Sequence, residues 1–186
     1  CDADRRMSAA FRNSDNAFGI VTRTLHWSIA LGVLGMLALG GYITRMEVGM
    51  SNFWLFGLHK SIGLTLLMLM ILRIAWHLVS PPPDPLPTQN WKDQLARWVH
   101  RGFYVLWLLV PLTGWIGSAA SGLDVVVFDR LTLPQIAPTS EALETAFFSA
   151  HWVLTKLLAA LAIAHIAGAL ARRDGTLRRM VRGTAT

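Results

Sequence analysis

Four long apolar runs constrain this chain more than any other feature of its sequence. Each is about as long as the roughly 20 residues that a helix needs to cross the hydrocarbon layer of a membrane. Only 15% of the 186 residues are charged, against about 25% in an ordinary soluble domain, and the mean hydropathy is +0.43. The sequence therefore predicts an all-α integral membrane protein, a four-helix bundle with spans at about residues 25–43, 53–78, 99–118 and 147–171.

Prolines mark one connection and one span. Pro81, Pro82 and Pro83 cannot continue a helix, so the segment after the second span is expected to be a loop. Pro111 lies inside the third span, where neighbouring helices can satisfy the carbonyl that it frees. The third connection, about residues 119–146, is the longest. We interpret it as a folded cap, with a simple linker as the alternative.

The distribution of arginine and lysine predicts the orientation in the membrane. Basic residues are concentrated in the N-terminal segment 1–24, between the second and third spans, and in the tail 172–186, whereas the third connection is mainly acidic. Because cytoplasmic segments carry the excess of arginine and lysine, both termini are expected on the cytoplasmic side of the membrane, with lipid around the spans. The net charge of +6 is explained by this topology, and nucleic-acid binding is not expected.

Cys1 is the only cysteine. One cysteine excludes a disulfide framework and a four-cysteine iron–sulfur site, and the sequence has no Cys-x-x-Cys-His motif for covalent haem attachment. A cysteine at position 1 indicates either a lipidated N-terminus or a chain that begins within a longer protein, and we favour the second interpretation. Residues 1–24 contain no apolar run, so no cleaved signal peptide is expected within them.

Four of the six histidines lie within the apolar runs: His26, His59, His151 and His165. Ionisable side chains are costly in a membrane and usually functional there, although a hydrogen bond to a neighbouring helix would explain a single histidine. His151 and His165 are 14 residues apart. At about 100° and 1.5 Å per residue they face the same way and lie roughly 21 Å apart along the helix axis. One histidine is thus expected near each side of the membrane.

The direction of each helix gives these two histidines a partner. His26 starts the first span and is expected at the inner depth of His165, whereas His59 lies near the start of the second span, at the outer depth of His151. Two histidine pairs, each from two facing helices, are what two non-covalent b-type haems require when histidine occupies both axial positions. These four histidines are therefore the predicted iron ligands.

Arg73 lies 14 residues after His59, on the same face of the second span and at the depth of the inner pair. A haem propionate would supply the anionic partner that a membrane arginine needs, and snorkelling toward the headgroups is the alternative. His77 and His100 are interpreted as interfacial, with a role beside a quinone headgroup or in proton delivery as the alternative. Small residues that would let a flat macrocycle approach the backbone, or would serve helix packing, are Gly32, Gly35, Gly63, Ala162 and Gly168.

Two other kinds of site are excluded. Histidines separated by the depth of a bilayer cannot converge on one zinc ion, and no carboxylate accompanies them in the sequence. A Ser–His–Asp hydrolase is excluded because no acidic residue lies within a predicted span.

Several short motifs, in this order, resemble the prokaryotic cytochrome b561 family of small four-helix dihaem membrane cytochromes. The matching segments are TLHW (24–27), LHKSIG (58–63), ILRIAW (71–76), VPLTGW (110–115), FDRLTLP (128–134), AHW (150–152), AHIAGAL (164–170) and RRDGTLRRM (172–180). The resemblance begins at about residue 20 and covers nearly all of the remaining chain. It implies the same ligand pairs, His26 with His165 and His59 with His151, and electron exchange with quinone. It also implies, as in some members, oxidation of superoxide at the outer face with delivery of the electron to ubiquinone.

We therefore expect a transmembrane electron conduit, an oxidoreductase that exchanges electrons with quinone and with a diffusible periplasmic donor or a partner redox protein. Because histidines would occupy both axial positions of each iron, outer-sphere electron transfer is expected rather than oxygen binding. Lys60, beside His59, would attract superoxide. The alternatives are a haem-bearing membrane anchor of a larger dehydrogenase or hydrogenase complex, and a cofactor-free membrane scaffold.

Overall fold

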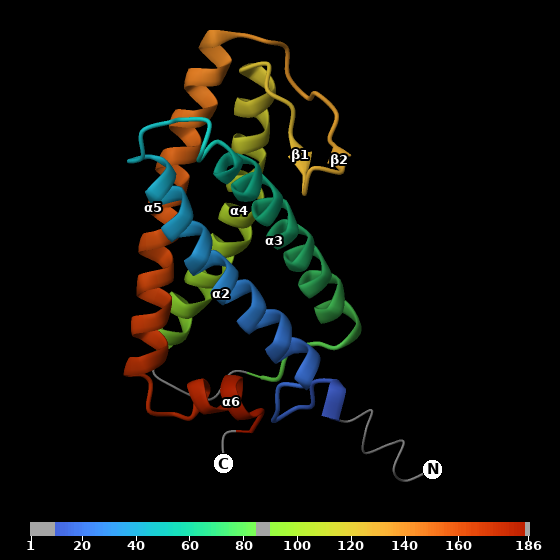
Figure 1. Ribbon diagram of the computed structural model, residues 1–186. Helices are drawn as coiled ribbons and strands as arrows, with labels where there is room; N and C mark the ends of the chain where they lie inside the picture. Colours follow the sequence, from blue (N-terminus) through green and yellow to red (C-terminus); the bar gives the residue numbers. More distant parts are fainter. Residues whose placement is uncertain (1–9, 85–89, 185–186) are drawn as a thin grey trace. The chain divides into compact units, whose positions relative to one another are not determined.

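The computed structural model describes residues 10–84 and 90–184, so Cys1, Arg5, Arg6 and the end of the proline-rich connection lie outside the described part. Its four long helices are apolar and long enough to cross a membrane, which confirms the predicted all-α membrane fold. A short hairpin precedes the last of them and a short helix follows it (Figure 1). The elements are α2 (Ile20–Ile43), α3 (Trp54–Val79), α4 (Asn90–Ala120), β1 (Val126–Val127), β2 (Leu131–Thr132), α5 (Glu141–Ala171) and α6 (Thr176–Arg182).

Three helices begin earlier than the predicted spans, and the first of them, α2, starts at Ile20 rather than near residue 25. α4 starts at Asn90 rather than near residue 99, because its first turns are amphipathic: Trp91, Leu95 and Trp98 recur at helical spacing among charged residues. α5 starts at Glu141 rather than near residue 147, with acidic residues in its first turn, where they interact favourably with the helix dipole. Mean hydropathy detects the membrane-crossing part of a helix and not these polar extensions.

The chain divides into two units. The first comprises Cys1–Ala30, Leu69–Gly102 and Leu161–Thr186, and the second comprises Leu31–Met68 and Phe103–Ala160. Each unit therefore combines segments of all four long helices that are far apart in the sequence.

In the first unit, a buried arginine joins α6 to the N-terminal segment. Arg179 is only 4% exposed. Its guanidinium donates hydrogen bonds to the backbone carbonyls of Asn16 (2.9 Å), Asp84 (2.7 Å) and Asp15 (2.9 Å). A buried charge is tolerated only with such partners, and the rigid fork of guanidinium donors can serve several acceptors at once.

Replacing Arg179 with lysine should destabilise the protein. A lysine keeps the charge but cannot reach three carbonyls in this geometry, so two charge-assisted hydrogen bonds are lost and the free energy of unfolding should fall by roughly 3 kcal/mol. Thermal unfolding in detergent, followed by circular dichroism, measures the change. The matched control is Arg178→Lys, at an exposed neighbouring position, and equal midpoint temperatures for the two variants would contradict the role of Arg179.

Arg172, directly after α5, binds two carboxylates. Its Nη2 lies 2.8 Å from Oδ1 of Asp93 in α4, and its Nε lies 2.9 Å from Oδ2 of Asp174. Thr176 donates two hydrogen bonds to Asp174, from its hydroxyl (2.6 Å) and its backbone N–H (3.0 Å). Burial opposes ionisation of Asp174, but the hydrogen bonds from Thr176 and Arg172 outweigh it and hold the pKa of this carboxyl below its ordinary value.

The lowered pKa of Asp174 predicts a pH-dependent contribution to stability. Because the folded-state pKa is depressed, the contribution is complete above the unfolded value of about 4 and is lost as the pH falls through the folded pKa. Asp174→Asn should therefore be less stable than the wild type at pH 7, with a difference that shrinks below about pH 4. Thermal unfolding across this pH range tests it. The exposed-loop control Glu47→Gln should not show this pattern, and a pH-independent difference for Asp174→Asn would contradict the prediction.

In the second unit, the connection from α4 to α5 is folded rather than a simple linker. β1 and β2 pair antiparallel, with Val126 opposite Thr132 and Val127 opposite Leu131. The backbone N–H of Ser140 donates to the carbonyl of Ala120 (2.9 Å), which joins the two ends of the connection.

Candidate functional site

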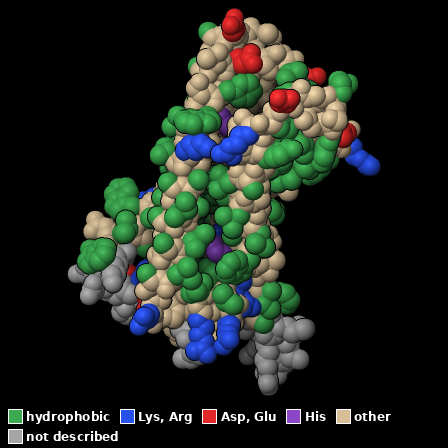
Figure 2. Space-filling view, turned by 60° about the vertical axis from the view of Figure 1, so that its left-hand side comes forward, with side chains coloured by type: hydrophobic (Ala, Val, Ile, Leu, Met, Phe, Trp, Pro, Cys, Tyr) green, Lys and Arg blue, Asp and Glu red, His purple; other side chains and the backbone are tan. Residues whose placement is uncertain are grey.

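Two histidines of the second unit face each other from two helices. His59 lies on α3 and His151 on α5, and their ring centres are 6.2 Å apart with the ring planes inclined at 77°. Both side chains are half-buried. Figure 2 shows histidine side chains within a surface that is mainly hydrophobic.

The first unit contains a second pair with the same separation. His26 of α2 and His165 of α5 have ring centres 6.2 Å apart and ring planes inclined at 59°. The structure thus brings together each of the two pairs that the depth argument predicted.

This separation suits a metal held between two imidazoles. Metal–nitrogen bonds of about 2 Å on opposite sides of one ion place the ring centres roughly 6 Å apart. Within residues 10–84 and 90–184, no three histidine, cysteine or acidic side chains converge on one point. Each pair therefore offers two protein ligands, which is what a haem iron needs, because the macrocycle supplies the remaining ligands.

The orientation of His151 is fixed by a backbone carbonyl. Its Nδ1 lies 2.8 Å from the carbonyl oxygen of Val110. A carbonyl only accepts hydrogen bonds, so Nδ1 carries the proton and Nε2 is left with the lone pair that can bind a metal. The Thr113 hydroxyl lies within hydrogen-bond distance of the same carbonyl (2.9 Å) and of that of Leu109 (2.8 Å), and its one proton is shared between the two.

Glycines make room for both rings of the second-unit pair. A Cβ at Gly40 would lie 3.3 Å from Cε1 of His59, and one at Gly114 would lie 3.2 Å from Cε1 of His151. Nδ1 of His59 is buried and has no hydrogen-bond partner in the described part of the chain, so packing orients this ring. No histidine lies within 4 Å of a Cβ built at any of the glycines that the sequence singled out, Gly32, Gly35, Gly63 and Gly168.

Arg73 lies near the pair of the first unit. Its Nη1 donates to the backbone carbonyl of Thr22 (3.2 Å), a residue that is fully buried and whose hydroxyl accepts a hydrogen bond from Trp76 (2.9 Å). The guanidinium is within electrostatic reach of His26 and His165. A cation thus lies within electrostatic reach of this pair.

His100 is the functional candidate that sequence reasoning underrated. Its ring centre lies 5.5 Å from that of His165, so it lies close to the pair of the first unit. The signal was its place at the start of the third predicted span, which the expected orientation puts at the depth expected for His26 and His165. A separation of 5.5 Å is shorter than the roughly 6 Å that an ion between the rings requires, so His26 fits better as the partner of His165.

For His77, Nε2 is buried and has no hydrogen-bond partner among the described residues.

Lys60, next to His59, is half-buried and held by the folded connection. Its Nζ donates to the backbone carbonyl of Asp124 (3.2 Å). The carboxylate of Asp124 accepts a hydrogen bond from Gln135 (2.8 Å). The Asp124 carboxylate lies within electrostatic reach of the lysine ammonium and offsets part of its charge.

Comparison with known proteins identifies the family. The pattern of the prokaryotic cytochrome b561 family matches residues 17–183. The chain is also 31% identical over 180 residues to "Cytochrome b561 homolog 2" of Escherichia coli (strain K12), an alignment that covers 92% of this chain and 95% of the relative. The chain belongs to the prokaryotic cytochrome b561 family. It is accordingly a multi-pass protein of the bacterial inner membrane, and membership implies b-type haem and electron transfer in the membrane.

Adding one methyl group at Gly40 should disturb the haem environment of this cytochrome. In Gly40→Ala the new Cβ presses on the ring of His59, which must shift by a few tenths of an ångström. We expect altered haem absorption and paramagnetic resonance spectra. The matched control is Gly35→Ala on the same helix, where a Cβ meets open space. It should leave the spectra unchanged and stabilise the helix by up to about 1 kcal/mol. Identical spectra for both variants would contradict the packing role of Gly40.

Proposed function

We propose that this cytochrome carries electrons across the membrane through two b-type haems, one bound by His26 and His165 and the other by His59 and His151. The observation that carries the proposal is the repeated 6.2 Å separation of facing imidazole rings. Each pair joins α5 to another long helix, so the fold itself holds the ligands at that spacing. Family membership supplies the cofactor that suits such pairs.

Haem, when bound, supplies a one-electron carrier. Two imidazoles of the protein would hold each haem iron, and such ligation would favour outer-sphere electron transfer over binding of oxygen. The carbonyl of Val110 orients His151 and strengthens it as a donor, since a hydrogen-bonded Nδ1 makes imidazole a more basic ligand. Arg73 is suited to pair with a haem propionate near His26 and His165.

Quinone is the proposed electron partner within the membrane, in line with the family resemblance. The basic N-terminal and C-terminal segments favour a cytoplasmic position for both termini. His59, near the start of the second predicted span, and His151, near the start of the fourth, are then expected toward the periplasm, where a diffusible donor or a partner redox protein can reach them.

Superoxide is the donor that best suits the charge near the second-unit pair. Lys60 adjoins the proposed ligand His59, and its ammonium donates a hydrogen bond to the neutral backbone carbonyl of Asp124. The Asp124 carboxylate offsets only part of this positive charge, because it forms no direct ion pair with Lys60 among the described residues. Such a cation raises the encounter rate with a small anion.

Removing single ligands should remove single haems. His59→Ala and His151→Ala should each lose one of two haems, His26→Ala and His165→Ala should each lose the other, and the remaining haem should keep its spectrum. Haem per polypeptide, measured on purified variants, tests this. The matched controls His77→Ala and His100→Ala should retain both haems. Loss of a haem in His100→Ala, with two retained in His26→Ala, would overturn the proposed pairing.

Reversing the charge of Lys60 should slow electron entry from superoxide. In Lys60→Glu the rate of haem reduction by superoxide in stopped-flow measurements should fall several-fold and become less sensitive to salt. The control Arg45→Glu changes an exposed cation after α2 and should have a smaller effect. An unchanged rate in Lys60→Glu would remove superoxide from the proposal. If the purified wild-type chain did not reduce quinone with any diffusible electron donor, a role as haem-bearing anchor of a larger complex would be favoured.

A further inference from the structure

The β1–β2 hairpin of the second unit makes its turn with unusual residues. The backbone N–H of Arg130 donates to the carbonyl of Val127 (3.1 Å), and the two residues between them, Phe128 and Asp129, have φ of 47° and 55°. Two-residue hairpin turns of this type usually contain Asn-Gly or Asp-Gly, because both central residues are left-handed. A bulky aromatic residue in this conformation is uncommon, so other contacts must hold it.

A buried serine of α3 provides that contact. Ser61 is 1% exposed, and its hydroxyl accepts a hydrogen bond from the backbone N–H of Phe128 (2.8 Å) while donating to the carbonyl of Gly57 (2.8 Å). The turn is therefore fixed on the side of α3, two residues beyond His59.

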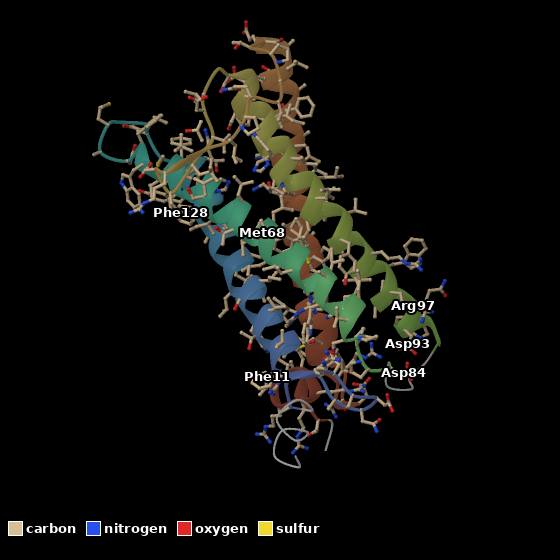
Figure 3. The ribbon with its side chains drawn as sticks, turned by 90° about the vertical axis from the view of Figure 1, so that its right-hand side faces the viewer. Phe11, Met68, Asp84, Asp93, Arg97 and Phe128 are labelled. Carbon is tan, nitrogen blue, oxygen red and sulfur yellow. The ribbon has the colours of Figure 1, made fainter. Side chains whose placement is uncertain are left out.

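The hairpin covers a stripe of α3 that is otherwise exposed. Trp54, Ser61 and Met68 are seven residues apart, which places them on nearly the same helix face at intervals of about 10 Å. Trp54 is 62% exposed and Met68 is 57% exposed, whereas Ser61 is covered by the turn. In a membrane-spanning helix this exposed stripe faces lipid. Figure 3 shows Phe128 beside α3, with Met68 farther along the same helix.

The turn directs apolar side chains away from the protein. Phe128 is 55% exposed and Leu131 is 60% exposed, although both belong to a segment outside the four spans. Asp129 and Arg130 are exposed beside them, and such charged groups favour the headgroup layer over the hydrocarbon layer. This combination of apolar and charged side chains at one tip is typical of segments that lie in the membrane interface.

We propose that the β1–β2 hairpin is immersed in the membrane, with Phe128 and Leu131 in contact with the acyl chains of the leaflet nearer the start of α3. Its partner is phospholipid, because the hairpin continues the lipid-facing surface of α3 from Trp54 to Met68. Asp129 and Arg130 remain at the headgroups. The connection between α4 and α5 is thereby anchored in the bilayer next to His59 and Lys60, and it shields this turn of α3 from lipid.

Spin-label accessibility tests this placement on the haem-loaded, full-length protein in vesicles of phosphatidylethanolamine and phosphatidylglycerol. In a Cys1→Ser background, single nitroxides are attached to Phe128→Cys, to Met68→Cys as the membrane reference, and to Ala142→Cys as the water reference. Ala142 is exposed in the first turn of α5, between Glu141 and Glu144. For each nitroxide, the rate of collision with oxygen, which is enriched in lipid, is compared with the rate of collision with a water-soluble nickel chelate. Each rate is obtained from the relaxation rate of the nitroxide after subtraction of its value under nitrogen.

The label at residue 128 should collide more often with oxygen than with the chelate, as the label at residue 68 does and the label at residue 142 does not. Its ratio of oxygen to chelate collision rates should lie between the ratios at these two reference positions. A ratio equal to that at Ala142 would place the hairpin in water and overturn the proposal. Low collision with both reagents would also overturn it, because the tip would then be covered by protein. Leu131→Cys provides a second position if Phe128→Cys does not yield folded protein, judged by its haem spectrum.

Discussion

Imidazole rings held in a membrane by helix geometry are the constraint on which the rest of this structure depends. Ionisable side chains are costly in hydrocarbon and usually functional there, and each proposed ligand faces a histidine of another helix at a ring-centre separation of 6.2 Å. α5 contributes to both pairs through histidines that share one face. The other helices must therefore pack against α5 with their own histidines turned toward it, which leaves little freedom in how the chain can be arranged within either unit.

The surroundings of the rings serve this arrangement. Gly40 and Gly114 let His59 and His151 lie against helix backbone, where any larger residue would displace them. The carbonyl of Val110 determines which nitrogen of His151 is free. In the first unit, Arg179 and Arg172 bind carbonyl and carboxylate oxygens at the ends of the helices. These contacts fix the helix ends of the unit that contains His26 and His165.

Hydropathy and helical periodicity predict most of the fold and the core of the candidate site. Each gives a property of one helix, its length, its face or the depth of a residue, and these suffice to pair His26 with His165 and His59 with His151. They do not give lateral neighbours, so the place of His100 beside His165 and of Gly40 against His59 could not be derived. The contacts of Arg179 could not be predicted from the sequence either, because its partners are backbone carbonyls, which every residue has. The amphipathic start of α4 was missed because hydropathy averages over the charges between Trp91 and Trp98.

The central claim is that the two histidine pairs hold two haems, each with both axial positions occupied. It is tested most directly by the haem-to-polypeptide ratio of the purified wild-type protein, together with the paramagnetic resonance spectrum of its oxidised form. We predict two b-type haems per chain, both low-spin, as two imidazole ligands to each iron require. A single haem per chain, or a high-spin signal from an iron with an open axial position, would contradict it.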